Sequence, residues 1–340
     1  MKIGLIAEDI NVSYEDALKL APLDLKNKIQ HSVELIRKAE KLALIYDPQN
    51  GFYNTFSGGK DSQALYYIVK MSGVKFQTHI NFTSVDPADV VRFVKTQYPS
   101  VIRHKPQISV YKKAVEKGIL PTMTRRWCCQ EYKEIGGAGK VKLIGIRSEE
   151  SVRRSKRNEV EVSAKKFSGN IDEFKEWSNK QIERKKKREF KNQDEFSVKN
   201  DNEVRCINGK DSILVSPIFY WTQKDVWHFL NNIIKAPHCK LYDEGKERIG
   251  CIMCPMASLK QTKKDIEKFP YVKKKWIEAI KEMVRNGKFD YKYTDNQNAT
   301  EDEIAENIFD YWINKESYNK WYSKKFLQQK INFDDNEKIN

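Results

Sequence analysis

A glycine-rich loop between a short apolar run and a helical pattern limits the fold of this chain more than any other feature. Residues 52–70 read FYNTFSGGKDSQALYYIVK. FYNTF is typical of a short buried strand, and the residues from Asp61 onward have helical spacing up to Gly73. Glycines let the backbone approach a ligand closely, and a following helix offers unpaired amides and a positive dipole end. The stretch therefore predicts a strand, an anion-binding loop and a helix.

This loop differs from the phosphate loop of kinases and GTPases. Their G-x-x-x-x-G-K-[ST] pattern needs a first glycine and a final hydroxyl that holds magnesium. Aligned on Gly59 and Lys60, the sequence has Asn54 at the first position and Asp61 at the last. We therefore exclude a Walker A loop and keep the prediction of a phosphate site.

Strand and helix patterns alternate through the first two thirds of the chain. Apolar periodicity predicts helices at 25–46, 86–99 and 109–118, and strands at 75–82 and 140–148. Such alternation is typical of an α/β fold with a parallel sheet covered on both faces. A further helix is expected after Thr222, with this threonine as its N-cap and Asp225 at the third helical position.

Three motifs resemble one protein superfamily. SGGKDS at 57–62 is similar to the pyrophosphate loop of the ATP pyrophosphatase and phosphoadenylyl-sulfate (PAPS) reductase superfamily. GIRSEES at 145–151 resembles the family's G-x-R-x-x-E-S segment, and SPIFYWTQKDVW at 216–227 resembles the segment that closes its core. The resemblance implies a doubly wound parallel sheet (adenine nucleotide alpha hydrolase-like) and cleavage of ATP between its α- and β-phosphates.

The chain is expected to have three parts. Residues 1–50 form an N-terminal helical segment, and 51–235 form the PAPS reductase-like ATP-binding core. Residues 236–340 form a cysteine-containing, mostly helical C-terminal region. Within the core, 151–203 is highly charged, and we interpret it as a basic insertion or mobile segment over the carboxyl edge of the sheet.

The resemblance, together with the chemistry of the side chains, implies a role for each site residue. Lys60 neutralises charge on the leaving pyrophosphate, and Asp61 binds Mg2+, fixes the loop or caps the helix. Arg147 reaches the α-phosphate or the activated oxygen, with Glu150 orienting it, and Asp86 lies near the ribose or the metal. The expected catalytic residues are Lys60, Asp61, Arg147 and Glu150. The expected nucleotide-binding residues are Ser57, Gly58, Gly59, Lys60, Asp61, Ser62, Asp86, Gly145 and Arg147.

Six cysteines in a chain that shows no secretion signal favour metal ligation or thiol chemistry over a disulfide framework. RWCC followed by Lys133, and LYDEG followed by IGCIMC at 249–254, resemble two segments of the iron-sulfur branch of the superfamily. The resemblance implies four ligands of a [4Fe-4S] cluster: Cys128, Cys129, Cys251 and Cys254. Tetrahedral zinc accepts the same four thiolates and remains an alternative.

Two cysteines fall outside this set. Cys206 lies in a predicted strand, and we interpret it as a buried inert thiol. Cys239 is either a plain loop cysteine or a reactive thiol near the cluster.

The net positive charge of the chain suggests a polyanionic binding partner. The net charge is +15, from 62 Lys and Arg against 47 Asp and Glu, which favours nucleic acid, although a solvated basic surface is an alternative. Basic residues of the insertion are candidates for phosphate contacts, and Trp177 and Phe190 for base stacking, with core packing as the alternative. They are Arg153, Arg154, Lys156, Arg157, Arg184, Lys185, Lys186, Lys187 and Arg188.

These features define the expected function. No cysteine follows Cys254, whereas sulfonucleotide reductases of the superfamily carry a nucleophilic cysteine in a C-terminal tail. We therefore expect an enzyme similar to DndC (DNA phosphorothioation) or to the cluster-dependent tRNA thiolases. Such an enzyme activates DNA or tRNA with ATP and inserts sulfur from a cysteine desulfurase. The alternatives are a phosphoadenylyl- or adenylyl-sulfate reductase and a non-catalytic module that binds nucleotide and nucleic acid. No run of 18 apolar residues occurs, so we expect no membrane span and a cytoplasmic protein.

Overall fold

The computed structural model describes residues 6–162, 166–191, 211–289 and 291–327. Two compact units make up the chain. The first unit comprises Met1–Asn81, Ala88–His104 and Ile135–Ile249, and the second comprises Phe82–Pro87, Lys105–Glu134 and Gly250–Asn340. This division cuts across the three segments expected from the sequence, because the second unit takes residues from two places inside the expected core.

A seven-stranded sheet forms the centre of the first unit, in the order β3-β2-β1-β4-β7-β5-β6. The pairs among β1, β2, β3, β4 and β7 are parallel, and β5 pairs antiparallel with both β6 and β7. The strands are β1 Phe52–Phe56, β2 Phe76–Asn81, β3 Ile102–His104, β4 Val141–Leu143, β5 Val160–Val162, β6 Phe167–Gly169 and β7 Ile213–Val215. The fold is thus α/β with a mostly parallel sheet, as expected.

The strand order reverses direction between β1 and β4. From β1 the chain moves outward through β2 to β3, and later returns to β4 on the other side of β1. In open α/β sheets, ligands bind beyond the carboxyl ends of the strands at such a switch point. The loop after β1 and the segment after β4 both begin there, and these two segments hold most of the predicted site residues.

The α-helices of the first unit are α1 Tyr14–Leu20, α2 Leu23–Tyr46, α3 Lys60–Ser72, α4 Ala88–Gln97, α6 Val152–Ser155, α7 Ile171–Lys191 and α8 Gln223–His228. Helices α2, α3, α4 and α8 were predicted, α1 lies within the expected N-terminal helical segment, and α6 and α7 were not predicted. Helix α3 ends at Gly73, whose left-handed φ of 70° suits glycine. Thr222 caps α8, and its side chain and that of Asp225 bond each other's backbone amides as predicted.

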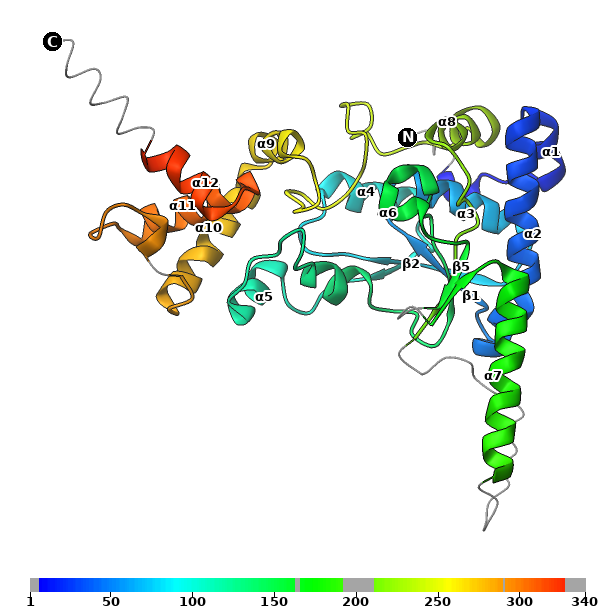
Figure 1. The fold of residues 1–340 in the computed structure, drawn as a ribbon. Coiled ribbons are helices and arrows are strands. Elements are labelled where there is room, and N and C mark those ends of the chain that lie inside the picture. The colour runs from blue at the N-terminus through cyan, green and yellow to red at the C-terminus, as the bar shows by residue number, and fades with distance from the viewer. Residues whose placement is uncertain (1–5, 163–165, 192–210, 290, 328–340) are drawn as a thin grey trace. The chain divides into compact units, whose positions relative to one another are not determined.

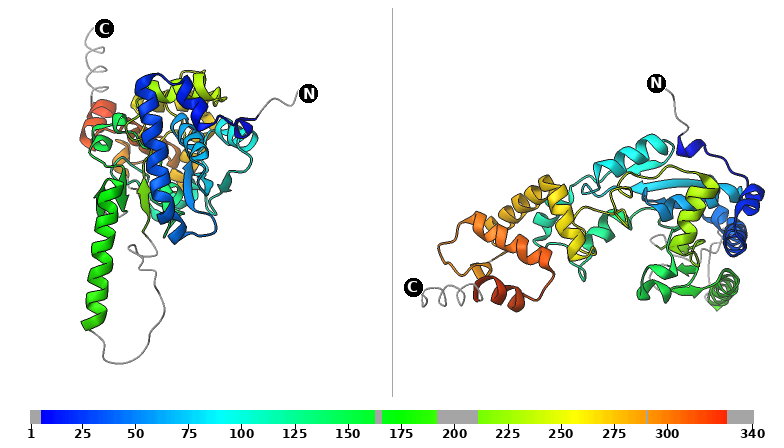
Figure 2. Two further views of the ribbon diagram at one scale, coloured as in Figure 1. Left: turned by 90° about the vertical axis from the view of Figure 1, so that its right-hand side faces the viewer. Right: turned by 90° about the horizontal axis from the view of Figure 1, so that it is seen from above.

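The charged insertion was only partly anticipated. Its first part adds strands to the edge of the sheet, because the alternating Val160-Glu161-Val162 pattern buries both valines against β7 and leaves the glutamate to pair with Arg157. Helix α7 then runs away from this edge of the sheet (Figures 1 and 2). The expectation of a segment lying over the carboxyl edge is therefore wrong for β5 and β6. Residues 192–203 of the insertion lie outside the described residues.

The second unit is helical within its described residues and packs around its own apolar core. Its helices are α5 Val110–Lys117, α9 Leu259–Lys268, α10 Pro270–Arg285, α11 Glu301–Asn314 and α12 Tyr318–Tyr322. Helices α10 and α11 pack side by side (Figure 2), and the indole of Trp276 meets the edge of Tyr111 at a centroid distance of 4.8 Å. The expected helical C-terminal region is confirmed over α9 to α12.

Candidate functional site

The loop after β1 is built so that its backbone is closely packed on one side. Gly58 has φ of 71°, and a Cβ atom there would lie 2.9 Å from a methyl carbon of Val94 on α4. Both constraints require glycine. Gly59 is the N-cap of α3 and has no side chain that could cap the helix. The first amides of a helix have no partners within it and can donate to an anion, as the sequence predicted for this loop, although the Lys60 amide here donates to the Tyr242 hydroxyl.

Two serine hydroxyls close the loop on itself. Ser62 Oγ accepts from the Ser57 amide at 3.2 Å and donates to the Gly59 carbonyl at 2.8 Å. Ser57 Oγ lies 3.1 Å from Ser62 Oγ and 3.4 Å from the Gly59 amide. The predicted phosphate ligands Ser57 and Ser62 thus also fix the shape of the loop. Asn54 lies upstream inside β1 and bonds Thr78, so it is a strand residue and not part of the loop.

Lys60 and Asp61 begin α3 and lie side by side. The Lys60 side chain is buried, with 3% of its residue surface exposed. Its Nζ atom lies 3.3 Å from Asp61 Oδ2 and 3.5 Å from the Glu247 carbonyl. The structure therefore keeps one positive charge at the loop, where the sequence predicted it.

Arg147 and Gly145 come from the end of β4. A Cβ atom on Gly145 would lie 3.2 Å from the Asp61 carbonyl oxygen, so this glycine lets the two segments approach closely. Arg147 is 3% exposed, and its Nε donates to Asp61 Oδ1 at 2.6 Å. Its Nη1 donates to Glu149 Oε2 at 2.8 Å and to the Trp221 carbonyl at 3.3 Å. Arg147 thus links the start of α3 to the segments after β4 and before α8, in addition to carrying a positive charge.

Two glutamates contact Arg147, and the one that bonds its guanidinium is Glu149, whereas the sequence predicted Glu150 to orient this arginine. Glu150 bonds the Arg147 amide at 3.2 Å and pairs with Arg154, while Arg248 lies 3.6 Å from its other oxygen. Glu149 holds the guanidinium and also accepts from the Gln223 amide at 2.6 Å. Sequence reasoning missed Glu149, because nothing in the motif separates the two adjacent glutamates.

Tyr242 is a second residue that the sequence did not single out. Its hydroxyl accepts a hydrogen bond from the Lys60 amide at 2.8 Å. The two residues are 182 positions apart in the chain, so no local sequence pattern could have predicted this contact.

The four predicted cysteine ligands belong to the second unit and are all free thiols. The hydrogen bond from Cys128 and the nearby Arg126 guanidinium lower the pKa of Cys129 to about 5, against the effect of burial. The same hydrogen bond, burial and the charges of Cys129, Cys251 and Cys254 raise the pKa of Cys128. Cys128 is therefore influenced electrostatically by the other three cysteines.

A buried lysine and a threonine accompany Cys251. Burial raises the pKa of Cys251, and the Lys133 ammonium opposes this rise. Burial lowers the pKa of Lys133, but Cys251 and Asp86 more than offset this and leave it raised. Thr83 Oγ1 lies 3.3 Å from Cys251 Sγ and 3.0 Å from Asp86 Oδ2. The structure thus places Asp86 in the second unit beside the thiols, whereas the sequence predicted it near the ribose of the nucleotide or the metal.

No preformed metal centre is found in the described residues. Among them, no three His, Cys, Asp or Glu side chains are arranged as a group that could hold a metal ion. The donor chemistry still suits a thiolate-bound metal, since four free thiols share one unit with two cationic side chains. Metal binding commonly organises its own ligands, because the thiolates repel one another until a cation joins them.

Of the two remaining cysteines, the structure describes Cys239 but not Cys206. Cys239 is 1% exposed and lies in the first unit, and burial raises its pKa. These surroundings favour an inert thiol over a reactive one. Cys206 lies outside the described residues.

The basic insertion offers fewer free side chains than the sequence indicated. Arg154 pairs with Glu150, and burial and the nearby Arg248 lower its pKa to about 10. Trp177 packs against Phe167 and Phe174 at centroid distances of 5.5 and 5.6 Å, so core packing explains it. Arg153 is exposed on α6, Lys156 is exposed directly after it, and Arg184 is exposed on α7. The side chains of Lys185, Lys186, Lys187, Arg188 and Phe190 lie outside the described residues.

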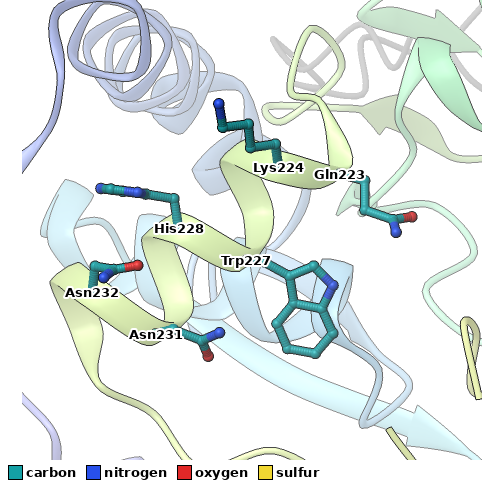
Figure 3. Close-up of a pocket in the computed structure, with 6 residues that line it drawn as sticks. All are labelled: Gln223, Lys224, Trp227, His228, Asn231 and Asn232. Atoms are coloured by element: carbon teal, nitrogen blue, oxygen red, sulfur yellow. The ribbon is translucent and has the colours of Figure 1, made fainter. Parts of the chain in front are cut away.

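Hollows in the described part of the first unit include a large one and a small one. The larger, of about 540 Å³, is an open depression on α8 and the segment after it, where the side chains fan out from one helical face (Figure 3). Its lining residues are Gln223, Lys224, Trp227, His228, Asn231 and Asn232. The second, of about 170 Å³, lies between the start of α2 and the segment before α8. Neither hollow contains a predicted site residue.

No helix in the described part of the chain is long and apolar enough to cross a membrane.

Comparisons with curated proteins find short or distant relatives. A segment of 73 residues is 40% identical to the uncharacterized protein MJ0066 of Methanocaldococcus jannaschii, covering 22% of this chain and 15% of that protein. A longer match, 27% identical over 177 residues, is to adenosine 5'-phosphosulfate reductase of Oceanobacillus iheyensis and covers 49% of this chain and 54% of the reductase. The chain thus spans about half or less of the length of these relatives.

Distant likenesses to solved structures include the following two. FMN adenylyltransferase of Candida glabrata is 16% identical, with a TM-score of 0.40 over 71% of this chain and 68% of that one. Phosphoadenylyl-sulfate reductase of Candida auris, in a phosphate complex, is 15% identical, with a TM-score of 0.37 over 68% of this chain and 96% of that one.

The family itself is clear from the sequence. A model of the phosphoadenosine phosphosulfate reductase domain matches residues 52–257, more than half of the chain. This stretch starts at β1, includes the glycine loop and the Arg147 segment, and ends just beyond Cys254. The chain belongs to the phosphoadenosine phosphosulfate reductase domain family.

Proposed function

We propose that the first unit binds ATP at the loop of residues 57–60 and cleaves it between the α- and β-phosphates. One observation carries this proposal: at the switch point of the sheet, the glycine-rich start of α3 and the buried Lys60 side chain lie beside the Arg147–Asp61 pair. Backbone amides and a cation in one place favour a polyphosphate.

Each loop residue has a proposed task. The amides of Gly58 and Gly59 hold the phosphates, and Lys60 neutralises the charge that develops on the leaving pyrophosphate. Both oxygens of Asp61 already accept from cationic side chains, which favours its role of fixing the loop over direct ligation of Mg2+. Mg2+ would accompany the nucleotide through the phosphate oxygens and water.

The proposed acceptor is DNA or tRNA. In the first step an acceptor oxygen attacks the α-phosphorus, a new P–O bond forms, the bond to the β-phosphate oxygen breaks, and pyrophosphate leaves. The acceptor oxygen is thereby converted into an AMP leaving group. The net charge of +15 supports a polyanionic acceptor.

The second step of the proposal replaces AMP with sulfur. The terminal sulfur of a persulfide, supplied by a cysteine desulfurase, attacks the activated atom of the acceptor and expels AMP. A thiol then cleaves the S–S bond, forming a disulfide with the donor cysteine and leaving the sulfur on the acceptor. Cys128, Cys129, Cys251 and Cys254 would hold a [4Fe-4S] cluster, which would carry sulfur for this exchange, and zinc is the alternative metal.

A sulfonucleotide reductase is the second candidate, because the longer curated match is to an adenosine 5'-phosphosulfate reductase. The two functions differ in their products. Sulfur insertion releases AMP and pyrophosphate from ATP and labels nucleic acid, whereas reduction releases sulfite from an activated sulfate.

The test uses anaerobically purified full-length protein with ATP, DNA or tRNA, a cysteine desulfurase and 35S-cysteine. We expect 35S in the nucleic acid and an equal amount of AMP. A matched reaction with adenylyl sulfate, phosphoadenylyl sulfate and a thiol reductant should release no sulfite. Sulfite release without labelled nucleic acid would establish the reductase, and nucleotide binding without either product would indicate a non-catalytic binding module.

A further inference from the structure

The Tyr242 hydroxyl occupies a backbone donor of the phosphate loop. Its oxygen lies 2.8 Å from the Lys60 amide nitrogen, and it lies 3.4 Å from the position of a Cβ atom built on Gly59. The Lys60 amide is one of the first donors of α3, the group of amides that an anion would use at this helix end. The hydroxyl thus sits where a phosphate oxygen would be bound.

The surroundings keep this hydroxyl neutral and in place. Burial raises the pKa of Tyr242, so the phenol remains protonated at physiological pH. The ring meets the indole of Trp227 edge-on at a centroid distance of 4.9 Å, and the Lys60 ammonium lies 6.0 Å from the ring centroid. The backbone of Ile249 contacts the same hydroxyl.

The segment that carries Tyr242 is anchored independently of the hydroxyl. Cys239 and Leu241, which precede Tyr242, are buried, and Lys240 pairs with Asp89 of α4 at 3.2 Å. His238 Nε2 lies 2.8 Å from Asp243 Oδ1 within the segment. These contacts hold the main chain, so a change of the Tyr242 rotamer would leave the segment in place.

A phosphate oxygen and the Tyr242 hydroxyl cannot both accept from the one Lys60 amide hydrogen at full strength. We propose that Tyr242 is a displaceable plug of the phosphate loop: a pyrophosphate group takes the Lys60 amide, and the tyrosine ring leaves its contact with Trp227. The residue thereby sets the affinity of the loop for polyphosphates. The inference rests on the proposed function in one respect, the assignment of a polyphosphate as the ligand.

The test measures the binding of inorganic pyrophosphate to the full chain by calorimetry. Tyr242→Phe removes the competing hydroxyl, and a hydrogen bond of about 1 kcal/mol net corresponds to roughly fivefold tighter binding. Tyr220→Phe is the matched control, because Tyr220 is an exposed tyrosine of the same unit that lines the smaller hollow, away from the loop. The Tyr220→Phe variant should bind pyrophosphate with the same affinity as the wild type.

A second readout follows the ring itself. Pyrophosphate should change the fluorescence of the wild-type protein, and Trp227→Phe should remove this change while the other six of the seven tryptophans remain. Unchanged or weaker binding by Tyr242→Phe, with normal binding by the wild type, would overturn the plug but leave the phosphate site intact. Absence of pyrophosphate binding in both proteins would overturn the phosphate site and the plug together.

Discussion

The glycine-rich loop of the first unit, residues 57–60, and the cysteine group of the second unit differ in how far their donor atoms are held in place by the protein alone. In the loop, serine hydroxyls, an Arg147–Asp61 pair and glycine backbone geometry fix the donors by mutual hydrogen bonds. The four thiols share one unit but do not form a metal-holding group. A backbone donor site is thus specified by the chain alone, whereas a thiolate site depends on its metal to draw like charges together.

The largest effect that we expect concerns the proposed metal ligands of the second unit. Cys251→Ser should remove most of the bound iron and the visible absorbance of anaerobically purified protein, because one of four thiolate ligands is lost. Pyrophosphate binding by the first unit should stay within about twofold, since binding of that anion uses backbone amides of the loop. Cys239→Ser, at a buried thiol of the first unit, serves as the control and should retain its iron. Retention of iron by Cys251→Ser would disprove the proposed ligand set.

The next effect concerns the charge at the loop. Lys60→Met should lower kcat/KM for pyrophosphate release by about 100-fold, as expected when one preorganised electrostatic contact to developing charge is removed. Steady-state assays of pyrophosphate release check this, with Lys19→Met at an exposed lysine as the control. Normal activity of the Lys60→Met enzyme would show that the Lys60 charge does not contribute to pyrophosphate release.

The stability of the loop depends on its buried pair. Asp61→Asn should lower the free energy of unfolding by about 3 kcal/mol, because it removes one of the two carboxylates paired with the buried Arg147 guanidinium. Urea unfolding measures the loss. Asp16→Asn removes an exposed carboxylate that pairs with Lys19 and should leave the midpoint nearly unchanged. Equal midpoints for the two variants would show that the pair does not fix the loop.

The smallest effect is a pH dependence that belongs to the sheet and not to either site. Burial and the neighbouring His104 lower the pKa of His79 to about 4, and His79 Nδ1 lies 3.0 Å from His104 Nε2. The unfolded histidine binds a proton below about pH 6.5 while the folded one resists it, so stability is lost as the pH falls from about 6.5 toward 4. Between pH 7 and 5 this amounts to about 2 kcal/mol.

Urea unfolding at several pH values tests this contribution. His79→Gln should reduce the loss of stability between pH 7 and 5 by most of that amount. An identical pH dependence in the variant and the wild type would assign the effect to other groups.

The features that sequence could predict are those encoded by neighbouring residues. The β1 strand, the loop and α3 followed from the order of apolar residues and glycines, and the cap of α8 followed from Thr222 and Asp225. Contacts between distant segments could not be predicted this way. Tyr242 reaches the loop from 182 positions away.

Other differences have local but ambiguous causes. Glu149 and Glu150 are adjacent and chemically identical, so only the backbone geometry decides which one holds the Arg147 guanidinium. The β5–β6 hairpin was missed because two strands of three residues each are too short to give a clear period in a highly charged stretch. Asp86 follows β2 as the sequence indicated, but the chain enters the second unit at Phe82.

The central claim is tested most directly by the position at which ATP is cleaved. ATP labelled in its γ-phosphate is incubated with the full-length protein, Mg2+ and DNA or tRNA, and the labelled products are separated. The proposal predicts label in pyrophosphate, with AMP as the other product and a rate that rises with nucleic acid. Label in orthophosphate, or no turnover with any nucleic acid, would contradict it.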